Sequence, residues 1–146
     1  LETQGIIMNK LKGDWEVEIR QADSKEKYFK PIKIYKKSWS RSDNDMFFGI
    51  EFQKLNFIEA WAGFRCVIKK ESLGILKQHT AKYNPKGDNE WWAIGQYLSI
   101  GKADFVKAMI LDDYSAERFA NEMAQMAMKF EAMTDEINHL KQQKVI

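Results

Sequence analysis

Apolar and polar residues alternate in several short runs between residues 14 and 98, and this two-residue period is typical of half-buried β-strands. In the first run, residues 15–21, Trp15, Val17 and Ile19 fall on one face and Glu16 falls on the other. Further strand-like runs occupy residues 28–39, 45–54, 60–69 and 90–98. Because clusters of turn-forming residues separate these runs, the pattern predicts an antiparallel sheet of about five strands.

The period changes to that of a helix at both ends of the chain. Near the start, Ile6, Ile7 and Leu11 share a helical face, and Gly13 follows as a helix stop. From residue 103 to about 142 the sequence predicts two helices, a short one and then a long one that Ser115 caps. Strands first and helices last indicate one α+β domain over residues 1–146, with the helices packed on one face of the sheet. The stretch 75–83 fits either a strand or a short helix.

The long helix carries an apolar stripe with a seven-residue repeat. Its members follow one another at spacings of four and three: Phe119, Met123, Met126, Phe130, Met133, Ile137 and Leu140. Such a repeat is typical of a helix that packs at a shallow angle against a partner. Two interpretations remain open. The stripe either covers the chain's own sheet, or it is an interface with a second copy of the chain or with the rest of a longer protein.

Charge is unevenly distributed along the chain. The formal net charge is +2 over 146 residues, but the segment 25–41 holds seven positive residues and one negative, a local charge of +6. Period-two spacing places five basic and aromatic residues of this segment on one strand face: Lys33, Tyr35, Lys37, Trp39 and Arg41. Lysines neutralise phosphates and aromatic rings stack on bases, so this face predicts contact with nucleic acid or with an acidic partner. The alternative is a solvated sheet face whose lysines protect an edge strand.

An acid-rich patch at the third strand raises the alternative of a magnesium-dependent nuclease. Such an enzyme needs converging carboxylates and a nearby lysine, and the candidates are Asp43, Asp45, Glu51 and Lys54. Lys54, however, is one position too late to share a strand face with Glu51. With two histidines, one cysteine and no nucleotide-binding glycine loop, other catalytic and metal chemistries lack residues. Outside the nuclease alternative, we therefore expect no catalytic residue, metal or cofactor.

One region resembles a known family. The runs "IYKKSW", "FFGIEFQ" and "AWAGFRCVIKK", within residues 34–70, are similar to the strand-rich C-terminal region of bacterial PD-(D/E)XK nuclease-superfamily proteins. The resemblance implies a DNA-associated context in which this segment follows a catalytic domain. It transfers no catalytic residue, because the metal-binding motif of the family has no clean match here.

These observations favour a non-enzymatic binding domain that assembles through its last helix. The two alternatives are the nuclease and a structural accessory domain of a larger bacterial or phage protein. A single cysteine and the lack of a long apolar run predict a cytoplasmic protein without a membrane span. The first residues, Leu-Glu-Thr, suggest a fragment of a longer protein.

Overall fold

The computed structural model describes residues 2–20, 30–39, 46–54, 57–86 and 91–146. These residues build a five-stranded sheet in which each strand pairs antiparallel with the next one along the chain. The strands are β1 (Trp15–Ile19), β2 (Ile32–Lys36), β3 (Met46–Lys54), β4 (Ile58–Cys66) and β5 (Trp92–Tyr97). The predicted α+β class with an antiparallel sheet is confirmed.

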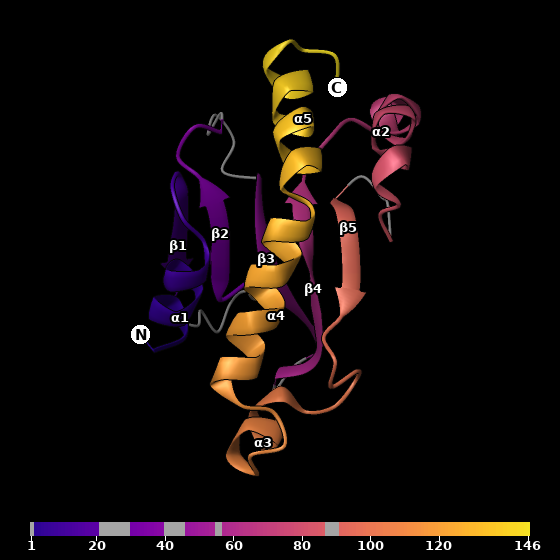
Figure 1. Ribbon diagram of the computed structural model, residues 1–146. Coiled ribbons are helices and arrows are strands. Elements are labelled where there is room, and N and C mark those ends of the chain that lie inside the picture. Colours follow the sequence, from indigo (N-terminus) through magenta and orange to yellow (C-terminus); the bar gives the residue numbers. More distant parts are fainter. Residues whose placement is uncertain (1, 21–29, 40–45, 55–56, 87–90) are drawn as a thin grey trace.

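The helices precede, interrupt and follow the sheet. They are α1 (Glu2–Lys10), α2 (Leu73–Thr80), α3 (Phe105–Ile110), α4 (Ala116–Lys129) and α5 (Glu131–Gln142), with 3₁₀ turns η2 (Lys70–Ser72) and η3 (Ala81–Tyr83) around α2. Figure 1 shows α4 and α5 running in one line across the sheet, with α1 beside β1 and α2 near the top of β5. The stretch that fitted either a strand or a helix is thus helical. None of the helices in the described ranges is long and apolar enough to cross a membrane.

Alternation within β3 and β4 decides which face of the sheet is the core. Phe48, Ile50 and Phe52 of β3 face the same way as Ala62 and Phe64 of β4, and all five are buried. These side chains join the residues of α4 and α5 in one hydrophobic cluster. Burying a large apolar side chain stabilises a fold by about 1.5–3 kcal/mol, so this face fixes the register of both strands.

Six of the seven members of the apolar stripe, all except Leu140, belong to this same cluster. All seven members of the stripe are buried within the single chain: Phe119, Met123, Met126, Phe130, Met133, Ile137 and Leu140. The interpretation that the stripe covers the chain's own sheet is therefore confirmed. Since the chain itself buries these seven side chains, packing within the chain accounts for the stripe, and assembly through it stays a prediction.

The long helix is also not continuous. Phe130 separates α4 from α5 with φ −106° and ψ 13°, values that depart from those of an α-helix. A straight α-helix drifts by about 20° per heptad relative to a seven-residue stripe. The break at Phe130 interrupts this drift, so the stripe stays on the sheet along both helices.

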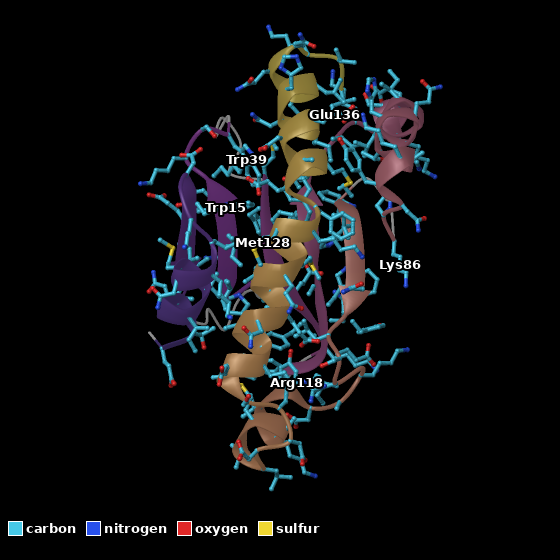
Figure 2. The ribbon with its side chains drawn as sticks, viewed as in Figure 1. Trp15, Trp39, Lys86, Arg118, Met128 and Glu136 are labelled. Atoms are coloured by element: carbon cyan, nitrogen blue, oxygen red, sulfur yellow. The ribbon has the colours of Figure 1, made fainter. Side chains whose placement is uncertain are left out.

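Trp39 departs from the predicted strand face. Strand β2 ends at Lys36, and the Trp39 amide donates to the Lys36 carbonyl in a turn (3.1 Å). The two-residue period ends with the strand, and the turn brings the Trp39 ring into the core, 5.5 Å from the ring of Phe64. Its indole N–H donates to the Asp135 carboxylate on α5 (3.1 Å). Figure 2 labels Trp39 between β2 and α5. The expectation that Trp39 lies on a surface face with Lys33 is wrong.

A polar cluster ties α2 to α5. The Glu136 carboxylate receives the Tyr83 hydroxyl (2.7 Å) and the Lys82 ammonium (2.8 Å), and it lies 3.2 Å from Nδ1 of His79. Figure 2 shows Glu136 on the side of α5 that is nearer α2. The hydrogen bonds from Lys82, Tyr83 and His79 lower the pKa of Glu136 from 4.5 to about 2. The charged carboxylate therefore stabilises the folded chain.

We predict that stability decreases in acid because of Glu136. A carboxyl whose pKa is depressed in the folded state stabilises above its unfolded pKa of 4.5, and this contribution is lost as the pH falls through about 2. Solvent screening reduces the contribution to about 1 kcal/mol. In chemical denaturation, Glu136→Gln should lower stability at pH 7 by that amount and remove this part of the loss between pH 4.5 and pH 2. Glu71→Gln, at an exposed glutamate of η2, serves as the control. An acid profile of Glu136→Gln identical to that of the native chain would contradict the assignment.

Candidate functional site

A hollow lies on the sheet face opposite α4 and α5. Its lining comes from β3, β4 and β5 and from the approach to β2: Lys30, Glu51, Gln53, Trp61, Arg65, Trp91, Trp92 and Tyr97. Glu51, Trp61 and Arg65 alternate along their strands with the core residues Ile50, Ala62 and Phe64, so their side chains point away from the helices. The hollow measures about 570 Å³, and we call it the trough.

A row of three glycines crosses the sheet beneath the trough. Gly49 of β3 pairs with Gly63 of β4, and Gly63 pairs with Gly95 of β5. On one side of this row Glu51, Trp61 and Tyr97 lie opposite one another, and on the other side Phe47, Arg65 and Trp92 do. The trough therefore exists because the middle row of its face has no side chains.

Close packing requires glycine at these positions. A Cβ atom on Gly63 would lie 2.0 Å from the carbonyl oxygen of Ile94, and one on Gly95 would lie 2.4 Å from the Trp61 ring. The ring of Trp61 thus rests directly on the backbone of β5. The ring atoms nearest to Gly95 are Nε1, Cε2 and Cζ2, on the side of the indole that carries the N–H.

A register shift gives β5 its place in the trough. Phe64 pairs with Ile94, but the next residue of β4, Arg65, pairs with Trp92. Ala93 is therefore an extra residue of the kind that forms a β-bulge. The bulge puts Trp92 instead of Ala93 opposite Arg65.

Aromatic rings make up most of the trough wall. Trp61 and Tyr97 meet edge to face with ring centroids 5.1 Å apart. The Arg65 guanidinium lies over the rings of Trp91 and Trp92, 5.3 Å and 5.8 Å from their centroids. Trp92 is buried, whereas Trp91 is 48% exposed. Such a large exposed ring beside a hollow is a feature of binding surfaces.

One carboxylate holds the two cations of the trough. Glu51 is only 7% exposed, and its carboxylate lies 3.3 Å from the Lys30 ammonium and 3.8 Å from the Arg65 guanidinium. The Gln53 amide donates a further hydrogen bond to it (2.9 Å). Two positive groups and one negative group leave the trough with a charge of +1. The arrangement suits an anionic ligand that also has a flat surface.

The nuclease alternative finds little support in this geometry. Of its four residues, Asp43 and Asp45 lie outside the described residues, and Glu51 lies in the trough. Lys54 pairs with Glu59 (2.7 Å), in line with its one-position offset from the strand face of Glu51. Within the described ranges, no group of three histidine, cysteine or acidic residues is arranged to hold a metal ion.

The five residues of the predicted basic and aromatic face separate in the structure. Lys33 pairs with Gly49 at the end of the glycine row, and its ammonium lies over the ring of Phe47 (4.7 Å). Tyr35 is buried, and Lys37 pairs with Glu16 beyond the end of β2. Trp39 is in the core and Arg41 lies outside the described residues. Of the five, Lys33 alone is shown next to the trough.

Apart from Glu51, the residues that line the trough were not predicted as a site. The two-residue period does place Trp61 and Arg65 on the face opposite Phe64, and this is the signal that the sequence offers. Trp92 and Tyr97 join them only through strand pairing and the bulge at Ala93, which a single sequence does not reveal.

A second hollow lies beside α3, and few polar side chains line it. It measures about 390 Å³, and its lining is mainly apolar: Phe57, Asp104, Val106, Lys107, Ile110 and Leu111. The side chain of Asp104 faces its own helix, where it accepts the Lys107 amide at the N-terminus of α3 (2.9 Å).

Comparison with protein-family models, curated proteins and solved structures gives no match to this chain. The resemblance to the PD-(D/E)XK superfamily therefore stays a prediction, and the trough must be interpreted from its own geometry.

The close packing at Gly63 predicts a large effect of one methyl group. Gly63→Ala should destabilise the chain by more than about 2 kcal/mol, because its Cβ would collide with backbone instead of with a flexible side chain. Gly74→Ala in α2 is the matched control, since a Cβ there meets no atom within 4 Å and alanine is favoured in helices by up to about 1 kcal/mol. Urea denaturation measures both. Equal stability of the two variants would mean that the strands do not approach as described.

Proposed function

We propose that this chain is a non-enzymatic binding domain that contacts nucleic acid through the trough. The observation that carries the proposal is the gathering of two cations and four aromatic side chains around one hollow of the sheet. Cations gain affinity from phosphates by releasing counterions, and aromatic rings gain it from bases by stacking. The basic segment 25–41 adds positive charge next to this face, since Lys30 and Lys33 belong to it.

The trough replaces the strand face as the proposed contact surface. Lys36, in the middle of the basic segment, binds Glu131 (2.7 Å) and Asp135 (2.8 Å) of α5. Although burial lowers the pKa of Lys36, the hydrogen bonds to Asp135 and Glu131 raise it overall. This lysine therefore acts in helix packing. Among the described cations of the segment, Lys30 and Lys33 lie on the trough side, where they contact Glu51 and Phe47.

An acidic protein partner is the alternative that the same charge permits. The four aromatic residues favour nucleic acid over it, because a carboxylate-rich peptide has few flat groups to stack. The same proposal places the domain in the cytoplasm, in a bacterial or phage protein that is longer than this chain. In that protein it supplies binding and another part supplies any catalysis, as the family resemblance implies.

A charge series within the trough tests the proposal. The trough charge is 0 in Lys30→Gln, +1 in the native chain and +2 in Glu51→Gln. Affinity for a fluorescent single-stranded DNA should rise in that order, by about threefold per charge at moderate salt, and the slope of log K against log salt should change by about 0.7 per phosphate contact. The increase expected for Glu51→Gln is informative, because damage to the fold would lower affinity instead.

Matched controls come from the opposite side of the molecule. Lys129→Gln and Glu117→Gln remove one charge of each sign from exposed positions on α4, and they should leave affinity unchanged. Absence of DNA binding by the native chain at low salt would overturn the proposed function. If DNA affinity is equal across the trough series but changes in the α4 variants, the contact surface lies on the helix side of the molecule and not at the trough.

A further inference from the structure

We infer that the trough is a site for one unpaired nucleobase, so that the domain prefers single strands to duplexes. This inference rests on the proposed function and specifies its ligand. Three features of the described residues support it: the size of the hollow, the ring on its floor and the position of its cations.

The size of the trough fits a ligand of one nucleotide. Small-ligand sites measure about 300–1,000 Å³, and the 570 Å³ of the trough lies within this range. A duplex has no single flat group to insert into such a hollow, because each of its bases is paired at its edge and stacked on both faces. A base in a single strand is available at a lower energetic cost.

Trp61 supplies the floor on which a base can stack. Its indole packs against Gly95, and the Tyr97 ring meets it at an interplanar angle of 88°. The backbone of β5 and the Tyr97 ring therefore hold the Trp61 ring in one orientation at the trough. A stacking platform that is already fixed loses little side-chain entropy when a base binds. Trp91 stands beside it as a partly exposed wall.

The cations lie where the phosphate next to a stacked base would be. Lys30 and Arg65 converge on Glu51, which is directly opposite Trp61 in the strand pairing. Glu51 holds both cations at the edge of the ring platform in the absence of ligand. A phosphate gains Coulomb attraction from this pair, whereas an uncharged sugar gains none. The net charge thus favours a nucleotide over a carbohydrate, although both stack on tryptophan.

The test compares two single strands of equal length and charge with a duplex of the same length, which has twice as many phosphates. One is a fully abasic single strand, the second is the same strand with one central thymidine, and the third is a duplex. A single thymidine should raise the affinity of the native chain by about fivefold or more over the abasic strand. The duplex should bind no better than the abasic strand per phosphate.

Variants then assign the effect to Trp61. Trp61→Leu keeps an apolar side chain but removes the ring, so it should abolish the advantage of the thymidine and leave the salt dependence intact. Trp61→Phe should retain part of the advantage. Since the oligonucleotide comparison uses the native chain, the inference stays testable even if Trp61→Leu proves unstable.

The outcomes separate this inference from the proposed function. Salt-dependent binding with equal affinity for the abasic strand and the thymidine strand would overturn the single-base site and leave nucleic-acid contact standing. A duplex affinity that, per phosphate, exceeds the affinity of the abasic strand would also overturn the single-base site and leave nucleic-acid contact standing. If neither strand bound at low salt, the proposed function itself would fail, and binding of a neutral glucan hexasaccharide in the same assay would replace both with a carbohydrate site.

Discussion

The burial of one sheet face beneath the two C-terminal helices determines the rest of the structure. Phe48, Ile50 and Phe64 meet the apolar stripe of α4 and α5, and this contact fixes which way every side chain of β3 and β4 points. Because a one-residue slip would expose the whole apolar set, the opposite face receives Glu51, Trp61 and Arg65 in a fixed order. The trough is thus a consequence of core packing on the other side of the sheet.

The sequence predicts the elements of this fold better than the surface that they create. Alternation located the strands, and Ser115 caps α4 as expected, accepting the Arg118 amide. The same alternation failed at Trp39, because it holds only while the chain stays extended and β2 ends three residues earlier. The seven-residue repeat identified the helical stripe, but its partner depends on tertiary packing. Here the stripe is buried within the chain itself.

Patterns of this kind could not predict the trough. Its lining depends on which residues lie opposite one another across four strands, and on a bulge that shifts Trp92 by one position. These relations involve residues up to 67 positions apart, Lys30 and Tyr97, and no local period records them. Glu51 was selected from the sequence as a metal ligand. Its neighbours instead make it the counterion of Lys30 and Arg65, which is a different role for the same carboxylate.

The glycine row gives the physical argument for regarding the trough as a site. Glycine weakens a strand, because it loses more backbone entropy on folding than other residues and contributes no side chain to packing. Three paired glycines in the middle of a sheet therefore lower stability unless the close approach that they allow is useful. Here they permit the Trp61 ring to pack directly on the backbone of β5 beside a buried ion cluster. Side chains in this row would force the neighbouring backbone and the Trp61 ring to move, and the trough would disappear.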